Sequence, residues 1–265
     1  MSKLKIGLIG CGSIGKFLLE KLNKEKLLPN YQICSVFDGR DSRRKKLQDL
    51  SETYEITIFQ DLNQFLQSGV DLVVECANIQ TVNDYAVRIV EQKDLLLISI
   101  GALANSSLYN ELQSVSKLNG TKLYLPSGAI GGLDVIKTAN IMGGLNAVSL
   151  VSRKPLTAFS NEQYNEETVL FEGSAKDAIQ KYPQNANVAI VLSLAGIGIE
   201  KTSVKIIADP GVNKNIHEIH AEGVFGEVDI TVQNNPSEGN AKTSYLTALS
   251  ILSALKSINE QVTIG

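Results

Sequence analysis

The feature that most constrains the fold is a glycine-rich turn near the start of the chain. Gly10, Gly12 and Gly15 directly follow the apolar run 6–9, and apolar residues then recur at helical spacing. In a strand–turn–helix unit the first glycine permits a tight turn, the second lets backbone approach a pyrophosphate, and the third lets helix pack on strand. Asp38 ends the next apolar run, 23 residues after Gly15, where a ribose-binding acid is expected after about 20. We therefore predict a dinucleotide-binding unit, against the alternative of an incidental glycine turn.

Apolar strands alternate with amphipathic helices as far as residue 125. The expected strands are 5–9, 32–37, 56–59, 72–75, 95–99 and 122–125, and the expected helices are 13–28, 42–52, 62–67, 82–92 and 107–118. Continuous Val, Ile and Leu runs are typical of strands covered on both faces, which predicts a doubly wound parallel sheet of the Rossmann type. Ligands of such sheets bind beyond the carboxyl ends of the strands. The residues at those ends form one candidate crevice: 10–12, Asp38, 76–78, 101–102 and 127–129.

The pattern changes after Pro126 to a mixed α/β region. Helices are expected at 134–142, 175–182, 188–195 and 243–258, strands at 148–153, 204–208, 216–222 and 227–232, and loops at 160–167 and 234–239. Extended runs separated by Pro, Gly and Asn predict a mostly antiparallel sheet. We therefore predict a dinucleotide-binding domain at 1–126 and a substrate-binding and dimerisation domain at 127–240. A C-terminal helix at 241–265 is expected to pack back on the first domain.

Composition limits the partners of the chain. Its 265 residues carry a formal net charge of −3, which argues against nucleic acid, because phosphate neutralisation needs a basic surface. Cys11, Cys34 and Cys76 are an odd number in strand or turn contexts, so we expect a reducing compartment and no disulfide framework. No apolar stretch reaches the roughly 18 residues that span a bilayer. We expect a cytoplasmic protein that binds no membrane.

The two histidines of the chain, His217 and His220, lie three residues apart in a segment with the alternation of a strand. Residues at that spacing on a strand face opposite sides, which disfavours a shared metal ion, and no Cys or His elsewhere completes a ligand set. We predict no metal site. His217 lies at the start of its strand, after the turn 209–211, where a side chain of the second domain can face the cofactor crevice. A structural role is the alternative.

Two further segments have alternative interpretations. The glycine-rich run 127–132 lets backbone come close to a flat ligand, or serves only as the entry to a helix. Asn185 and Asn187 precede an Ala-rich helix, where capping alone could account for either residue. The chain has no Gly-x-Ser-x-Gly elbow and no Walker lysine motif, which removes several competing enzyme classes.

Five stretches taken together resemble the L-aspartate dehydrogenase family: residues 10–15, 100–103, 126–134, 171–175 with 182–188, and 215–219. They cover nearly the whole chain, and the middle and histidine stretches are more specific than the dinucleotide motif. The resemblance implies that His217 is the catalytic histidine and that Ala129 and Asn187 contact NAD. His220 matches a position that is not restricted to histidine. One departure is Ala241, where the family usually has proline.

The resemblance implies oxidation of the Cα–N bond of L-aspartate, with hydride passing to NAD. The product iminoaspartate hydrolyses to oxaloacetate and ammonia or supplies NAD biosynthesis. An imidazole with a pKa near 6.5 can move the required proton near neutral pH, although the sequence leaves open which proton that is. The protein is expected to be a homodimer by analogy.

The predicted cofactor site combines motif and resemblance: Gly10, Gly12, Ser13, Ile14, Gly15, Asp38, Ala77, Gly101, Ala129 and Asn187. Asp38 favours NAD, because a carboxylate accepts both ribose hydroxyls and repels a 2′-phosphate. Arg40 and Arg43 follow closely enough to admit NADP as well. Candidates for holding the substrate carboxylates, by charge and resemblance, are Lys242, Thr243, Ser244 and Arg153.

Two other functions stay open. Another two-domain dehydrogenase, acting on homoserine or dihydrodipicolinate, would have a similar layout. Homoserine dehydrogenases are expected to use acid and lysine chemistry, so the histidine motif argues against that alternative. A non-catalytic NAD-binding regulator is possible because fold alone does not determine function, but the acidic chain shows no DNA-reading module.

Overall fold

The computed structural model describes residues 3–38, 44–159, 164–183, 186–237 and 240–262. The chain divides into two compact units. The first comprises residues 1–126 with 254–259, and the second comprises residues 127–253 with 260–265. The division falls within the C-terminal helix, α9 (Tyr245–Ile258). In the first unit, the Tyr31 hydroxyl donates a hydrogen bond to the Leu255 carbonyl, which ties the end of this helix to the sheet.

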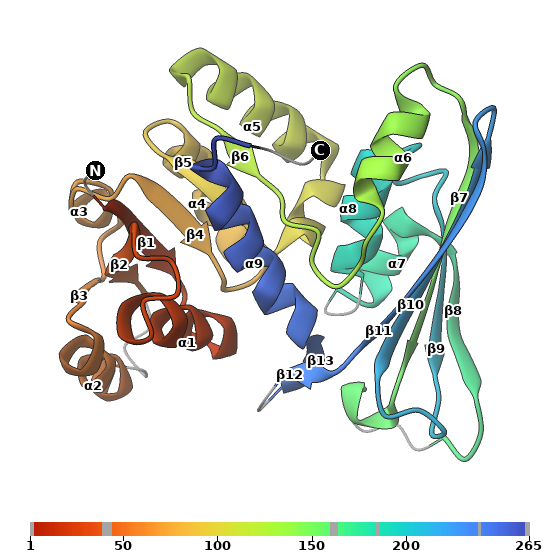
Figure 1. The fold of residues 1–265 in the computed structure, drawn as a ribbon, viewed down its shortest axis with the longest axis horizontal. Coiled ribbons are helices and arrows are strands. Elements are labelled where there is room, and N and C mark those ends of the chain that lie inside the picture. The colour runs from red at the N-terminus through yellow and green to blue at the C-terminus, as the bar shows by residue number, and fades with distance from the viewer. Residues whose placement is uncertain (1–2, 39–43, 160–163, 184–185, 238–239, 263–265) are drawn as a thin grey trace. The chain divides into compact units, whose positions relative to one another are not determined.

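The first unit is built on a parallel sheet of six strands in the order β3-β2-β1-β4-β5-β6 (Figure 1). Its strands are β1 Leu4–Ile9, β2 Tyr31–Phe37, β3 Thr57–Phe59, β4 Leu72–Glu75, β5 Asp94–Leu97 and β6 Leu123–Tyr124. This order reverses direction between β1 and β4, which is the arrangement typical of dinucleotide-binding sheets. Ile6, Leu8, Ile33, Val73 and Leu95 are fully buried, because helices cover both faces. The predicted Rossmann sheet is confirmed.

The helices of the first unit follow their predicted positions with shifted ends. They are α1 Ser13–Leu19, α2 Arg44–Tyr54, α3 Leu62–Leu66, α4 Ile79–Val90 and α5 Ser106–Asn119, with a 3₁₀ turn at Ile100–Ala104. The helix predicted at 13–28 changes at Glu20–Lys24 into a wider π-helical turn. Within this turn the Asn23 side chain exchanges two hydrogen bonds with the Ile33 backbone. Helix α4 begins before the predicted residue 82, because the Asn78 side chain accepts a hydrogen bond from the Thr81 backbone nitrogen and caps it.

The second unit contains a five-stranded sheet in the order β11-β10-β7-β9-β8. Its strands are β7 Leu145–Lys154, β8 Thr168–Ser174, β9 Ser203–Ala208, β10 Asn215–Gly223 and β11 Gly226–Asn234. Only the β7–β9 pair is parallel, so the predicted mostly antiparallel sheet is confirmed. The sequence interpretation missed β8, since this edge strand buries only Phe171 and lacks clear alternation.

A small second sheet pairs β12 Pro236–Ser237 with β13 Asn240–Ser244. Two predictions were wrong here. Residues 236–237 are not purely loop, and the C-terminal helix begins at Tyr245, not at 243. The reason is that the residues just before the helix pair with β12.

The helices of the second unit are α6 Leu133–Asn140, α7 Ala175–Lys181 and α8 Asn187–Ala195, with a 3₁₀ turn at Leu156–Ala158. Figure 1 shows α6, α7 and α8 on one face of the five-stranded sheet. Strand β10 accordingly buries every second residue from Asn215 to Ala221. Among the described residues, no helix has the length and apolar character needed to cross a membrane.

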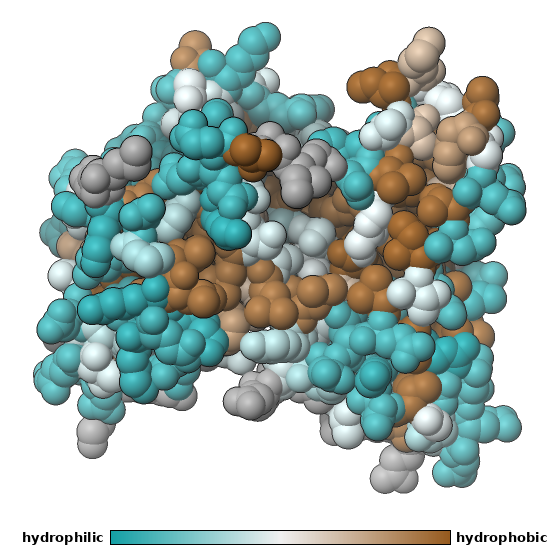
Figure 2. Space-filling model, viewed as in Figure 1, coloured by the Kyte–Doolittle hydropathy of each residue, from teal (hydrophilic) through white to brown (hydrophobic). Residues whose placement is uncertain are grey.

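An apolar patch lies where the end of α6 adjoins the β10–β11 turn. Its members Ile141, Met142, Val224 and Phe225 are 83%, 93%, 89% and 44% exposed. Val224 donates its backbone N–H to the carbonyl of Gly144, which holds the two segments together. Figure 2 shows brown side chains at the upper right, over this end of the sheet.

Candidate active site

The glycine turn after β1 is shaped as a dinucleotide pyrophosphate requires. Gly10 has φ +85, and a Cβ there would lie 2.7 Å from the Cβ of Ala77. A Cβ on Gly15 would lie 2.9 Å from the Gly10 carbonyl oxygen, whereas one on Gly12 would meet nothing within 4 Å. The first and third glycines are therefore required by the turn and its packing, and the second faces open space at the start of α1. These residues fit the phosphates of a dinucleotide.

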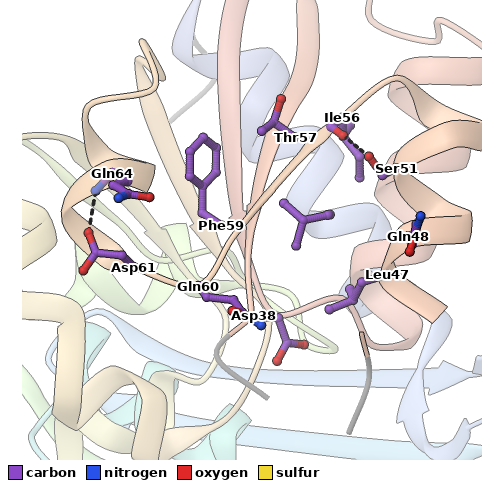
Figure 3. Close-up of a pocket in the computed structure, with 11 residues that line it drawn as sticks. Asp38, Leu47, Gln48, Ser51, Ile56, Thr57, Phe59, Gln60, Asp61 and Gln64 are labelled. Atoms are coloured by element: carbon purple, nitrogen blue, oxygen red, sulfur yellow. Dashed lines mark hydrogen bonds between the residues drawn. The ribbon is translucent and has the colours of Figure 1, made fainter. Parts of the chain in front are cut away.

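Asp38 directly follows β2, is only 4% exposed and lines a pocket of about 650 Å³ (Figure 3). The remaining lining residues come from α2, β3, the start of α3 and adjoining positions: Leu47, Gln48, Ser51, Ile56, Thr57, Ile58, Phe59, Gln60, Asp61 and Gln64. Apolar side chains beside a carboxylate suit a flat ring joined to a ribose. Arg40 and Arg43, which bear on the choice between NAD and NADP, lie outside the described residues.

Glu75 connects the ends of β4 and β5, next to the predicted cofactor residues Ala77 and Gly101. Its carboxylate accepts hydrogen bonds from the backbone nitrogens of Ala77 at 2.7 Å and Ser99 at 2.9 Å, and from the Ser99 hydroxyl at 2.9 Å. Burial raises the pKa of Glu75, and these donors oppose that rise. The sequence interpretation missed Glu75, although an acid closing a fully buried strand was the available signal.

In the second unit, His217 lies on the helix-covered face of β10 and is 2% exposed. Its strand partner across the sheet is Ser152 of β7, and the Ser152 hydroxyl lies 3.1 Å from Nδ1 of the imidazole. A neutral imidazole carries one proton. For Nε2 to accept a second proton, the one proton of the neutral ring must lie on Nδ1, which then donates it in a hydrogen bond to the Ser152 hydroxyl oxygen. Ser152 is therefore placed to orient the ring and select its tautomer.

Burial lowers the pKa of His217 to about 3, with a smaller contribution from the positive charge of Lys154. The imidazole is therefore fully neutral at neutral pH, and it holds a proton less tightly than a ring with the ordinary pKa value near 6.5 expected from the sequence. The neutral ring is the form that can accept a proton. Lys154 lies two residues beyond Ser152 on β7, and burial lowers its pKa to about 8.

His220 faces away from His217, as the strand alternation predicts. Its side chain is 40% exposed, and its Nδ1 lies 2.8 Å from the carboxylate of Asp229 on β11. The hydrogen bond to Asp229 raises the pKa of His220. The two histidines therefore occupy opposite electrostatic environments. Among the described residues, no group of three His, Cys, Asp or Glu side chains could hold a metal ion.

Buried amides extend the polar cluster around His217. Asn215, two residues earlier on β10, donates from Nδ2 to the Ser244 hydroxyl at 3.2 Å. Its cross-strand partner Asn234 donates from Nδ2 to the Ala129 carbonyl at 3.0 Å. Two predicted site residues, Ser244 and Ala129, are therefore bonded to strand residues at the same end of the sheet as His217.

The glycine-rich run 127–132 is anchored by further contacts within the second unit. The Gly128 backbone nitrogen donates to the Ser250 hydroxyl at 3.2 Å. Gly132 has φ +74, and a Cβ there would lie 1.9 Å from a methyl carbon of Ile230 on β11. Only glycine fits at position 132, so at least part of this run serves packing.

The remaining predicted site residues are Asn187, Lys242, Thr243 and Arg153. Asn187 is the first residue of α8 and Thr243 is half-buried, whereas the side chain of Lys242 is outside the description. Arg153 lies on the face of β7 opposite Ser152, where its guanidinium contacts Glu167 at 2.5 Å and Asp209 at 2.6 Å. The structure does not bring it to His217.

Ser152, Lys154 and Asn215 are site residues that the sequence interpretation missed. A signal was present. Polar residues occupy alternate positions at the ends of two otherwise apolar strand faces, Ser152 with Lys154 and Asn215 with His217. Only the antiparallel pairing of β7 with β10 brings the two pairs together.

Comparison with known proteins identifies the family. The family model for the C-terminal part of aspartate dehydrogenases matches residues 134–258, and that for the NAD-binding domain of homoserine dehydrogenases matches residues 10–126. An L-aspartate dehydrogenase of Methanosarcina mazei is 39% identical, with 99% of each chain covered. The chain belongs to the L-aspartate dehydrogenase family.

Other relatives agree in sequence and in fold. An L-aspartate dehydrogenase of Methanococcus maripaludis is 36% identical over 99% of each chain. The crystal structure of an aspartate dehydrogenase from Thermotoga maritima superposes with a TM-score of 0.79 at 28% identity, with 99% of each chain covered. The resemblance and the fold class predicted from the sequence are therefore both confirmed.

Proposed function

We propose that the protein is an NAD-dependent L-aspartate dehydrogenase that converts L-aspartate to iminoaspartate, which hydrolyses to oxaloacetate and ammonia. The observation that carries the proposal is the neutral, buried His217, which Ser152 orients on the helix-covered face of the second unit's sheet. Full-length similarity to L-aspartate dehydrogenases supports the choice of substrate. The first unit binds the dinucleotide, and the second holds the substrate.

A bound nicotinamide supplies the acceptor for the hydride that leaves the substrate Cα. As the Cα–N bond becomes a double bond, the substrate ammonium gives up one proton, and we assign its acceptance to Nε2 of His217. Ser152 supports this step by accepting the proton at Nδ1 in a hydrogen bond. A water molecule then adds to the imine carbon and ammonia leaves. A positioned acid–base group of this kind contributes about 10²- to 10⁴-fold to the rate.

The cofactor choice rests on the first unit. The open space at Gly12 would admit the pyrophosphate, and Ser13, Ile14 and Gly15 begin the helix behind it. Asp38 would accept the ribose hydroxyls at the edge of the pocket that would take the adenine. We therefore propose NAD over NADP. Ala77 and Gly101 are proposed to line the same strand ends, and Ala129 and Asn187 are proposed as further NAD contacts.

The test of this function is an absorbance assay for NADH formation with L-aspartate, L-homoserine and buffer alone. We expect NADH formation with L-aspartate only. NADH formation with L-homoserine but not with L-aspartate would indicate a homoserine dehydrogenase. The assay includes L-homoserine because residues 10–126 match the NAD-binding domain of homoserine dehydrogenases. Calorimetric NAD binding without turnover of either substrate would instead favour a regulator.

Three finer features complete the proposal. The apolar patch of Ile141, Met142, Val224 and Phe225 supports a homodimer, since contiguous exposed apolar surface of this kind marks association sites. All three cysteines are in the thiol form, which supports the cytoplasm as location. Iminoaspartate as product supports a role in NAD biosynthesis.

A further inference from the structure

Lys154 places a cationic side chain on the helix-covered face of the second unit's sheet. It is the last residue of β7 and is 4% exposed. Strand alternation puts it on the same face as Ser152, whose hydroxyl contacts His217.

The other described cations on these strands are placed differently. Arg153 and Lys205 lie on the opposite face of the sheet, as the pairing of Lys205 with Val151 and the alternation of β7 require. There Arg153 contacts two carboxylates, and Lys205 contacts Glu172 at 3.0 Å. Among the described lysines and arginines of the five-stranded sheet, Lys154 is therefore the one that faces the catalytic imidazole.

We propose that Lys154 binds a carboxylate of the dicarboxylate substrate beside His217. The proposal deepens the proposed function and rests on it, because aspartate brings two carboxylates to a face whose imidazole is neutral. A cation is then needed to hold the anion against its loss of hydration. Asn215 and Ser244, which are bonded to each other near His217, offer polar neighbours for the same anion.

This assignment also connects substrate binding with proton transfer. Burial is the main cause of the lowered pKa of His217, and the charge of Lys154 adds to it. A carboxylate bound to the ammonium offsets that charge. Substrate binding therefore removes one of the two effects that weaken His217 as a proton acceptor.

A purely structural role for Lys154 makes a different prediction for ligand binding. If Lys154 only supports the fold, its replacement leaves the affinity of the folded variant for a dicarboxylate unchanged. If Lys154 binds the substrate carboxylate, replacement by an apolar side chain of similar length weakens that affinity.

The test uses Lys154→Met, with Lys205→Met as the matched control on the opposite face. Calorimetry in the presence of NADH measures the affinity for succinate, a four-carbon dicarboxylate without an amino group. We expect Lys154→Met to weaken succinate binding by about 10- to 100-fold, the range for a hydrogen bond to a charged group. The affinity for NADH should be unchanged, and Lys205→Met should behave as the unmodified protein.

Several outcomes decide the matter. Unchanged succinate affinity in folded Lys154→Met, or a lack of succinate binding by the unmodified protein, would overturn the proposal. If Lys154→Met does not fold, Lys154→Gln, which keeps a donor but no charge, must show the same loss of affinity. Failure of the proposed function is separate: Lys154-dependent succinate binding without NADH formation from L-aspartate would support the carboxylate site and reject the dehydrogenase.

Discussion

The buried imidazole of His217 makes the stability of this protein depend on pH in a definite direction. In the unfolded chain the histidine takes up a proton below pH 6.5, whereas burial in the folded protein lowers its pKa to about 3. Between these two values the unfolded state binds more protons than the folded state. The free energy of unfolding therefore falls as the pH is lowered through this window.

The size of the effect follows from the shift. Each pKa unit corresponds to about 1.4 kcal/mol. A shift from 6.5 to about 3 gives an upper limit of about 5 kcal/mol over the whole window, and about 2 kcal/mol is already lost at about pH 5. This is a large fraction of the roughly 5–15 kcal/mol that stabilises a typical domain.

Urea denaturation at several pH values between about 5 and 7.5 measures this dependence. We expect the unmodified protein to lose stability across the range more steeply than His217→Leu, whose side chain does not titrate. The Ser152 hydroxyl left without its imidazole lowers the stability of the variant by an amount that does not change with pH.

His220 provides a control of opposite sign. Its pKa is raised by Asp229, so its contribution is fully present below pH 6.5 and is lost as the pH rises through the folded-state pKa. The difference in free energy of unfolding between the unmodified protein and His220→Leu should therefore be larger at the acid end of the pH range than at the alkaline end. Parallel stability curves for the unmodified protein and His217→Leu would refute the reasoning.

Three further predictions concern activity and cofactor binding. His217→Ala should lower kcat by about 10²- to 10⁴-fold with NAD affinity retained, whereas His220→Ala should keep most activity; a reversal of the two would contradict the assignment of the catalytic histidine. The ratio of kcat/KM for NAD over NADP should exceed one and should fall in Asp38→Ala; a preference of the unmodified protein for NADP beyond about tenfold would reject the role of Asp38. Gly12→Val should weaken NAD binding in calorimetry with little change in melting temperature, since a Cβ there meets nothing within 4 Å; unchanged affinity would remove the turn as the phosphate site.

Much of the first unit could be predicted because its signals are local. The three glycines, the acid at the end of β2 and the continuous apolar strands each reflect a requirement of the backbone within one strand–turn–helix unit. The structure confirms those strands, and it shows that Gly10 and Gly15 are confined by contacts that leave no room for a side chain. The opposite facing of His217 and His220 also followed from the period of a strand alone.

What the tertiary structure decided is which distant residues meet and how strongly they are shielded from water. Strand alternation places His217 and Lys154 on a face of their own strands, but the sequence does not contain the pairing of β7 with β10 that brings them to one site. The pKa of His217 depends on burial beneath helices far along the chain and on the charge of Lys154, and neither is a property of the segment around it. Likewise Glu75 is one acid among many in the sequence, and only the parallel pairing of β4 with β5 gives its carboxylate the backbone donors of the neighbouring strand end. Periodicity and turn chemistry act over a few residues and can therefore be predicted from the sequence. Desolvation and through-space charge depend on contacts that only the folded chain creates.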